Sequence, residues 1–489
     1  MFVQPPGGSA IPIVAGAGYE PFGPLKALLM GNWIQEWRAF DRRFSPTAIT
    51  ATDGKSLPPV LDWAYTVDPA GNVTAIEDLL KAENNRSFGY EDFNYFLTTG
   101  NGPWGTRSWT YDAIGNRLSQ TRDGAGSTYS YLLNPAAQNT PRLQAISGAE
   151  TATYLYDAVG NVDVESVPDP VDFTWNRASN LAGISDSSQL VYDGRGYLRS
   201  AARPGFAKAS FETDLTYSTA GRLLAYESTE EEIQRKYKVV YLAGRPVAVV
   251  RIDVASQEVI THYYTTDHLG TPILVTDSAA NVHWEGGLEP FGENDANVLK
   301  FDVRLGFPGQ YADLAWERER PVLRYNVHRW YEPQTGRYTR PDPLGFKPVG
   351  VLAEFLGALP AHREHALNLF VYARSNPLAY VDPTGLMECK CTESEPLQSD
   401  SPACDKYGAT PHMGVSLRCF CKCAGNSTWS QDVRGCLSCD WDKGVNMYSA
   451  HAECYVSASK KSAPPMATLV ICYEQCFVGF PGQGSGGGW

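Results

Sequence analysis

The stretch Trp109–Leu118, WTYDAIGNRL, decides the fold of this chain. Trp109 and Tyr111 stand two residues apart, so they share one face of a strand. Asp112 can accept a hydrogen bond from the backbone two residues on, which begins a turn. Gly115 supplies the positive φ that closes the turn. The stretch therefore predicts a strand, a tight turn and an antiparallel return strand.

The same sequence motif recurs along the first half of the chain. Clear copies lie at Tyr65–Val73, Tyr154–Val162 and Val191–Leu198, and degenerate copies at Phe173–Asn176 and Leu215–Leu223. One strand and one turn per repeat, stacked on their neighbours, predict a winding sheet or a solenoid. The repeated aromatic residues are expected to pack on one another as a wall, with carbohydrate binding as the alternative.

Composition agrees with short strands joined by tight turns. The chain has 27 Tyr, 12 Trp, 45 Gly and 33 Pro. Its net charge of −13 gives no support for nucleic-acid binding or for binding to an anionic membrane. No stretch approaches the roughly 20 apolar residues of a membrane span, and the N-terminus lacks the basic and apolar regions of a signal peptide.

The cysteine residues are confined to the C-terminal part of the chain. All 11 cysteines follow the pentapeptide Asp382–Leu386, DPTGL. We expect four parts, which are an N-terminal partial repeat region (1–60), a repeat sheet (61–262), a denser core module (263–386) and a cysteine-rich tip (387–489).

The core module contains a series of short blocks rich in Gly, Pro and aromatic residues. They are Tyr264–Pro272, Trp284–Glu293, Phe307–Tyr311, Arg329–Tyr338, Arg340–Gly345 and Asn376–Leu386. Together with the preceding repeats, these blocks resemble the Rhs/YD-repeat family and its C-terminal core module. The resemblance runs from about Tyr65 to Leu386. It implies a mainly β fold, in which a winding YD-repeat sheet (a partial shell or solenoid) carries a core plug and a small C-terminal domain.

The resemblance also implies that the chain cuts itself between Leu386 and Met387. By motif match, the acid/base pair is Asp342 and Asp382, and Arg329 orients or stabilises charge. Two close carboxylates can share one proton, so that one activates water while the other donates a proton. This chemistry needs no cofactor in the core. The alternative is that both Asp-Pro pairs only begin turns.

One departure bears on this assignment. The link between the two aspartate blocks is lengthened by an insert at 346–360, within which 353–359 could form a short apolar helix. Cleavage is expected to fail if the insert holds the two aspartates apart.

The tip is dense enough in cysteine to be a disulfide scaffold, and zinc is the equal alternative. Cys436 and Cys439 have the spacing of a zinc knuckle, which Cys421 and Cys423 could complete. The odd number of cysteines leaves at least one thiol free or bonded to another chain.

The hypothesis that the tip is an enzyme depends on few residues. His451 and Glu453 match the His-x-Glu of zinc deaminases, but Cys472 and Cys476 do not match the partner Pro-Cys-x-x-Cys. The alternative is a pair on the surface of a helix. His412 and His451 are the only histidines in the tip, and we recognise no toxin family there.

The resemblance favours an Rhs-type polymorphic toxin, or a C-terminal part of one, that encloses its own tip as cargo. It implies a cognate immunity protein, a component of a specialised secretion system, and a secreted or cell-surface location. Because the chain is short for a complete shell, a further N-terminal portion is expected. The alternative is a non-enzymatic YD-repeat surface or interaction protein with an inert junction.

Overall fold

The computed structural model describes residues 1–386 except 6–7, 22, 55–58, 168, 186–187, 207–208, 231–232, 287–288, 294–303, 313–321 and 344–367, and then 389–397, 413–423, 428–439 and 448–455. The chain divides into two compact units. The first holds Met1–Glu20 and Pro24–Glu388, and the second holds Pro21–Gly23 and Cys389–Trp489. The expectation of a short helix at 353–359 lies outside the described residues.

The first unit contains a 16-stranded sheet in which each strand pairs with the next one along the chain. All of these pairs are antiparallel. The strands are β3 (Val14–Tyr19), β4 (Leu25–Met30), β5 (Gln35–Phe40), β6 (Pro46–Thr52), β7 (Leu61–Val67), β8 (Val73–Asp78), β9 (Arg86–Tyr90), β10 (Leu97–Gly102), β11 (Gly105–Tyr111), β12 (Arg117–Arg122), β13 (Ala125–Leu133), β14 (Asn139–Gly148), β15 (Ala152–Tyr156), β16 (Val162–Ser166), β17 (Pro170–Trp175) and β18 (Leu181–Ile184).

A 9-stranded sheet follows with the same sequential antiparallel order. Its strands are β19 (Gln189–Tyr192), β20 (Leu198–Phe206), β21 (Ala209–Tyr217), β22 (Leu223–Glu230), β23 (Ile233–Leu242), β24 (Arg245–Asp253), β25 (Val259–Thr266), β26 (Pro272–Thr276) and β27 (Val282–Glu285). A short hairpin of β1 (Phe2–Val3) and β2 (Ile11–Pro12) and the 3₁₀ turn η1 (Ala82–Asn84) complete the repeat region. We call β3–β27 the wall.

The repeat turns form as the sequence predicts. Between β11 and β12, Asp112 Oδ1 accepts hydrogen bonds from the backbone N–H of Ile114 at 3.1 Å and of Asn116 at 2.9 Å. Gly115 has a φ of 80°. In addition, Asn116 Nδ2 donates to Asp112 Oδ2 at 2.9 Å, so the asparagine after the glycine closes the turn through its side chain. The aromatic partner Trp109 is buried.

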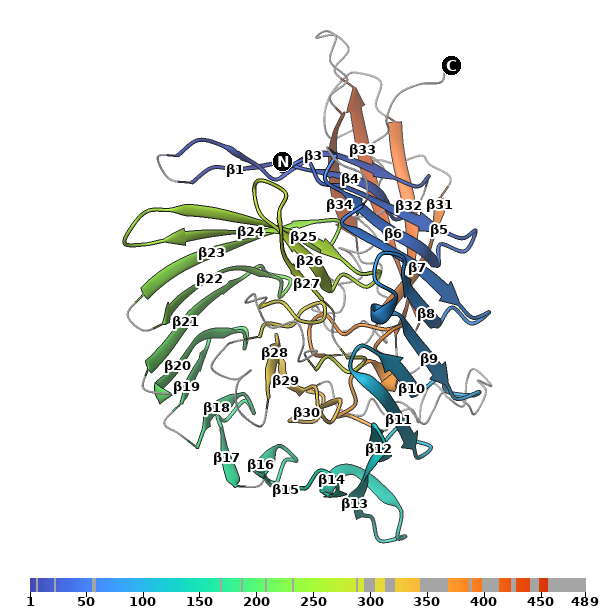
Figure 1. Cartoon of the computed structure of the whole chain (residues 1–489), viewed down its shortest axis with the longest axis vertical. Helices are drawn as coiled ribbons and strands as arrows, with labels where there is room; N and C mark the ends of the chain where they lie inside the picture. The colour runs from blue at the N-terminus through green and yellow to red at the C-terminus, as the bar shows by residue number, and fades with distance from the viewer. Residues whose placement is uncertain are drawn as a thin grey trace. The chain divides into compact units, whose positions relative to one another are not determined.

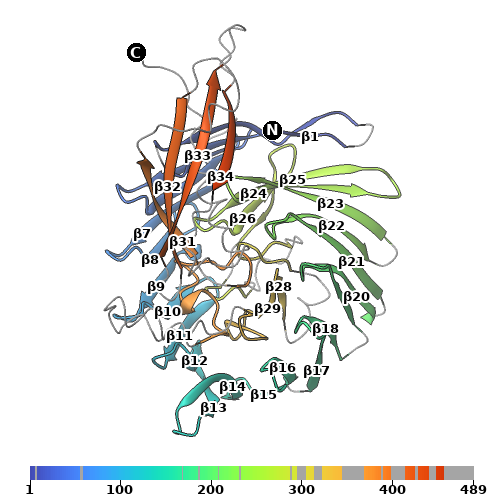
Figure 2. The same cartoon turned by 180° about the vertical axis from the view of Figure 1, so that it is seen from behind.

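Inside the wall lies the core module, which we take as its described residues from 304 to 386. It contains a three-stranded antiparallel sheet and a 3₁₀ turn. These elements are β28 (Arg324–Asn326), β29 (Arg329–Glu332), β30 (Arg337–Tyr338) and η4 (Ala373–Ser375). Figures 1 and 2 show the wall strands curving round β28–β30 from both sides. The sequential strand order makes this a winding sheet, and the two wall sheets do not join into a closed barrel.

The first and last parts of the wall meet through side chains. Arg38 on β5 donates to the carbonyl oxygen of Thr266 on β25 at 2.6 Å and forms a buried ion pair with Glu36. Near the same seam, Asn32 Nδ2 donates to Thr276 Oγ1 at 2.9 Å. Apolar residues from both sheets also share one core cluster here. The seam therefore closes by packing and by side-chain hydrogen bonds.

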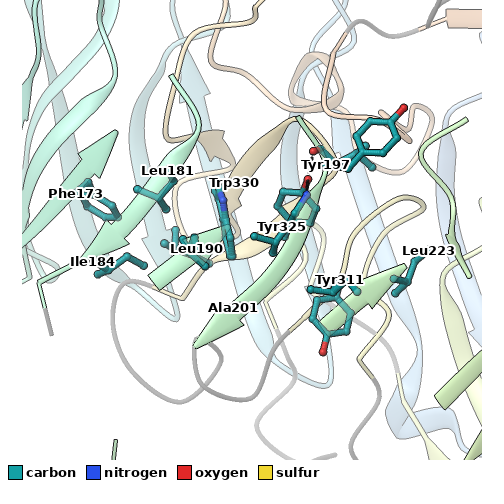
Figure 3. Packing of buried hydrophobic residues seen from close by; sticks show 14 of the residues in the cluster. Phe173, Leu181, Ile184, Leu190, Tyr197, Ala201, Leu223, Tyr311, Tyr325 and Trp330 are labelled. Carbon is teal, nitrogen blue, oxygen red and sulfur yellow. Dashed lines mark hydrogen bonds between the residues drawn. The ribbon is translucent and has the colours of Figure 1, made fainter. Parts of the chain in front are cut away.

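An aromatic cluster joins the core module to the wall (Figure 3). Trp330 Nε1 donates to the hydroxyl of Tyr192 at 3.0 Å, and the ring of Tyr325 lies 5.3 Å from that of Trp330. The Tyr325 hydroxyl accepts the backbone N–H of Leu198 at 2.6 Å. The repeated aromatic residues thus act as packing residues, as expected.

The buried asparagines of the repeat turns hold the core module as well. Asn116 Oδ1 accepts from Asn368 Nδ2 at 2.9 Å, and Asn72 Oδ1 accepts from Asn376 Nδ2 at 2.9 Å. Asn72 and Asn116 are 3% and 0% exposed, so each contact satisfies a polar group that would otherwise be costly to bury. The repeat turn therefore closes a hairpin and also holds the core module against the wall.

The second unit contains a four-stranded antiparallel sheet with sequential order. Its strands are β31 (Cys389–Leu397), β32 (Met413–Cys423), β33 (Thr428–Cys439) and β34 (Tyr448–Tyr455). The prediction of a mainly β fold is confirmed. The expected division at residue 262 falls within β25, and β6 before residue 60 pairs with β7 after it. A helix able to cross a membrane is not found in the described part of the chain.

Candidate functional site

A tight turn between β28 and β29 positions Arg329. The backbone N–H of His328 donates to the carbonyl oxygen of Asn326 at 2.6 Å, which closes a three-residue turn around Val327. Val327 has a φ of 54° although it is β-branched, a conformation that such residues rarely adopt. Strain of this kind costs on the order of 1–3 kcal/mol and persists where the surroundings fix it. Val327 is fully buried, and Tyr325 donates its hydroxyl proton to the Val327 carbonyl.

The turn is also bonded to the DPTGL segment. His328 N–H donates to the carbonyl oxygen of Thr384 at 3.1 Å, and Asn326 Nδ2 donates to that of Asp382 at 2.8 Å. Gly385 lies against this turn with a φ of 67°. A Cβ atom at that position would stand 2.2 Å from the carbonyl oxygen of Asn326. Only glycine fits there without movement of the backbone.

One nitrogen of Arg329 brings the predicted site together. Arg329 Nη2 lies 3.0 Å from Asp342 Oδ2, 2.9 Å from Asp382 Oδ2 and 2.6 Å from the carbonyl oxygen of Leu386. Because both carboxylates contact one nitrogen, their oxygens lie within roughly two hydrogen-bond lengths of each other. The carbonyl in the same contact belongs to the bond predicted to be cut.

The remaining donors of Arg329 are also engaged. Nη1 donates to the carbonyl oxygen of Leu369 at 3.0 Å, and Nε donates to that of Gly385. Burial opposes the charge of Arg329, but the attraction of Asp342, followed by Tyr338 and Asp382, raises its pKa above the ordinary value. The guanidinium therefore carries its charge near neutral pH.

Two residues at the site were missed by the sequence prediction. Tyr338 donates its hydroxyl proton to Asp382 Oδ2 at 2.7 Å, and Asn326 Nδ2 donates to the Tyr338 hydroxyl at 2.8 Å. The backbone N–H of Leu386 donates to Asp382 Oδ1 at 3.1 Å. Tyr338 stands in the same sequence block as Arg329, four residues before Asp342, which is the one signal that pointed to it.

Other charged and titratable groups lie beside the site. Burial and the neighbouring Arg340 lower the pKa of His328 to about 4, so its ring is neutral near pH 7. Burial and the like charge of Arg329 lower the pKa of Arg340 to about 10. Arg340 Nη2 donates to the carbonyl oxygen of His328 at 2.6 Å. Two arginines thus face two aspartates in a largely buried region.

The insert at 346–360 and Met387 lie outside the described residues. Asp342 and Asp382, on either side of the insert, nevertheless contact the same guanidinium nitrogen. The insert therefore does not hold the two aspartates apart.

The tip candidates are placed by strand register alone, and His412 lies outside the described residues. Cys421 on β32 stands opposite Trp429, whereas Cys436 and Cys439 lie seven and ten residues further along β33. Seven residues of strand span about 23 Å, so the register does not bring Cys436 near Cys421.

Two other features of the tip follow from the same register. Cys391 stands opposite Cys421, and Cys389 stands opposite Cys423. His451 and Glu453 lie two apart on β34, so the alternative of a helix-surface pair is wrong. Among the described residues, no three His, Cys, Asp or Glu side chains gather as metal ligands.

Comparison with known proteins finds relatives that are similar in sequence and in fold. The family model described as RHS protein matches residues 261–294. The double-stranded DNA deaminase toxin A of Burkholderia cenocepacia (strain H111) is 26% identical over 331 residues, which cover 66% of this chain and 19% of that protein. Toxin protein Tse5 of Pseudomonas aeruginosa (strain PAO1) is 29% identical over 169 residues, or 33% of this chain and 11% of that protein.

Solved structures give the same fold. The crystal structure of TcdB2-TccC3 superposes with a TM-score of 0.61 at 18% identity, covering 79% of this chain and 20% of that one. The chain thus spans about a fifth or less of the length of each of these similar proteins. The repeat turns, the ordered core blocks, the family-model match and the winding wall agree, and the chain is similar to RHS proteins of the YD-repeat type.

Proposed function

We propose that this chain is the shell and core portion of an Rhs-type toxin that cuts itself once, between Leu386 and Met387, and thereby frees its C-terminal tip. One observation carries the proposal. Arg329 Nη2 touches the carbonyl oxygen of Leu386 and one oxygen of each of Asp342 and Asp382. A turn-forming role for the two Asp-Pro pairs gives no reason for both carboxylates to meet at that carbonyl.

The reaction is hydrolysis of a peptide bond. One carboxylate of the pair takes a proton from water as the water oxygen attacks the carbonyl carbon of Leu386. Arg329 stabilises the negative charge that develops on the carbonyl oxygen. The other aspartate, protonated, gives its proton to the amide nitrogen of Met387 as the C–N bond breaks. The products are a carboxylate on Leu386 and an amine on Met387.

The geometry supports reaction within a single chain. The bond to be cut is held on its N-terminal side by the contacts of Asp382 and Arg329 to the backbone of Leu386. Holding reactant and catalytic groups together can replace the entropy cost of a bimolecular encounter. After cleavage, the new Leu386 carboxylate would remain beside Arg329, so the site would act once.

Expression of the full chain tests this proposal. We expect a denaturing gel to show two fragments, and mass spectrometry to give a C-terminal fragment that begins at Met387. Buffers containing a chelator or a thiol-blocking reagent should leave the cut unchanged, because neither metal nor thiol takes part. An intact chain under all of these conditions would contradict self-cleavage and leave the RHS fold as an inert interaction scaffold.

The second part of the proposal concerns the tip. Two similar proteins carry the word toxin in their names, which supports an effector role for the segment that follows Leu386. A cognate immunity protein and a specialised secretion route to the outside belong to the same proposal. The cysteines of the tip would form disulfides or hold zinc. The mass of the freed tip with and without reductant and chelator distinguishes the two.

We expect expression of 387–489 alone to arrest growth of a bacterial host, whereas expression of 1–386 should not. Co-expression of the neighbouring immunity gene should restore growth. Colony counts after induction measure both effects. A harmless tip that accumulates in intact form would overturn the toxin assignment without affecting the cleavage assignment.

A further inference from the structure

We propose that Tyr338 is a positioning residue for the self-cleavage reaction, which orients the Asp382 carboxylate. This inference rests on the proposed function of the site. Nothing in the sequence blocks singles out the hydroxyl of Tyr338.

Asp382 is fixed at both of its oxygens. Oδ2 accepts the hydroxyl proton of Tyr338 at 2.7 Å and a guanidinium N–H of Arg329 at 2.9 Å. Oδ1 accepts the backbone N–H of Leu386 at 3.1 Å. Rotation of the carboxylate would break all three bonds, so its plane is set relative to the bond to be cut. In the described part of the chain, the Tyr338 hydroxyl hydrogen-bonds to Asp382 and Asn326 alone, whereas Arg329 also contacts Asp342 and the carbonyl oxygen of Leu386.

The phenol itself is held so that its proton must face Asp382. Asn326 Nδ2 donates to the phenol oxygen at 2.8 Å, which leaves the hydroxyl proton free to point to the carboxylate. The guanidinium carbon of Arg329 stands 3.6 Å from the centre of the Tyr338 ring, so the ring also supports the arginine. Burial, and then the charge of Asp382, raise the pKa of Tyr338 well above its ordinary value. The phenol therefore remains a donor throughout the working pH range.

This arrangement predicts how the hydroxyl acts on the chemistry. A donor aimed at a carboxylate favours its charged form, and a hydrogen bond to a charged group contributes more than one between neutral groups. The Asp342 side chain is 11% exposed and that of Asp382 is 3% exposed, so Asp382 is the one more dependent on protein donors. Loss of the hydroxyl should leave Asp382 Oδ2 with one donor fewer and the carboxylate freer to rotate.

The competing explanation is that Tyr338 only packs. Its ring lies 5.7 Å from that of Tyr331 in a buried aromatic cluster, and phenylalanine would preserve that contact. A packing role therefore predicts that Tyr338→Phe changes neither the rate of cleavage nor its dependence on pH.

The test follows cleavage of the full chain after refolding. Chains purified in denaturant are diluted into buffers of different pH, folding is followed by tryptophan fluorescence, and the cut fraction is then timed on gels. We expect Tyr338→Phe to cut roughly tenfold to a hundredfold more slowly than the unaltered chain. The pH–rate profile of this variant should also differ from that of the unaltered chain, because the hydroxyl contacts one of the two carboxylates that act as a unit.

Tyr331→Phe is the matched control. It removes another buried hydroxyl from the same cluster, but this hydroxyl donates to the carbonyl oxygen of Phe291 and contacts neither aspartate. We expect its pH–rate profile to match that of the unaltered chain. If Tyr338→Phe has the unaltered rate and profile, the positioning role is wrong.

A second measurement covers the case in which Tyr338→Phe does not fold. Difluorotyrosine placed at position 338 alone preserves the ring and makes the phenol a stronger donor. We expect the pH–rate profile to differ from that of the unaltered chain, and an unchanged profile would overturn the proposal. An unaltered chain that never cuts would instead contradict the proposed function itself.

Discussion

Asp382→Asn should leave the chain as a single uncut polypeptide, with the rate of cleavage lowered on the order of a thousandfold or more. The amide has the shape of the carboxylate but cannot carry its charge or exchange its proton. In the folded protein it would also face two donors, Arg329 Nη2 and the Tyr338 hydroxyl, with one acceptor oxygen. The full-length band on a denaturing gel, followed for hours after refolding, measures this loss.

The reciprocal variant and a matched control sharpen this prediction. Asp342→Asn should be equally inactive, because the two carboxylates act as one unit. Asp277→Asn replaces a repeat-turn aspartate on the wall, where asparagine already stands at the corresponding Asn176 of a degenerate copy. This control should fold and cut normally. Cleavage by the Asp382 variant at the normal position would remove that residue from the mechanism.

Local patterns were sufficient to predict the wall. The Asp112 turn depends on residues within four positions of one another, and its hydrogen bonds form as expected. Each strand then pairs with its neighbour in sequence, so the topology needs no long-range information. The same locality explains why the side-chain role of Asn116 could be missed, since its second partner, Asn368, is 252 residues away.

The site was predictable only in part, because resemblance supplied residue types and the fold supplies their geometry. Motif matching named Asp342, Asp382 and Arg329. In the structure, both aspartates contact the same nitrogen of Arg329. The contributions of Tyr338 and Asn326 depend on where their polar atoms point after folding. No periodicity or spacing in the sequence carries that information.

The seam of the wall shows the same limit. Arg38 reaches the carbonyl of Thr266, which is 228 residues further along the chain. Arg38 also forms a buried ion pair with Glu36, which is only two residues away in the sequence. The sequence therefore shows that the two charges are close, but it does not show that they lie at the seam. Buried charges of this kind are costly unless they are paired and hydrogen-bonded, and the seam provides both.

Gly385→Ala should slow cleavage by about a hundredfold or more while leaving the wall folded, because misplacement of reacting groups by an ångström is enough for such a loss. The added Cβ would stand 2.2 Å from the carbonyl oxygen of Asn326 and 3.2 Å from the backbone nitrogen of Arg329. Both neighbours are backbone atoms, so neither can turn aside as a flexible side chain would. The DPTGL segment must therefore move, and Leu386 would lose its contact with Arg329 Nη2.

Gly124→Ala separates this clash from the strain of a left-handed backbone. Gly124 has a φ of 86°, compared with 67° for Gly385, but a Cβ atom there meets no other atom within 4 Å. We expect Gly124→Ala to cut at the normal rate, with a modest loss of stability of about 1 kcal/mol. Normal cleavage by Gly385→Ala, measured by the same refolding assay, would mean that the observed seating of Leu386 against Arg329 is not the reactive one. The contrast between the two glycines thus tests whether close approach to the β28–β29 turn, rather than backbone conformation alone, places the bond for cleavage.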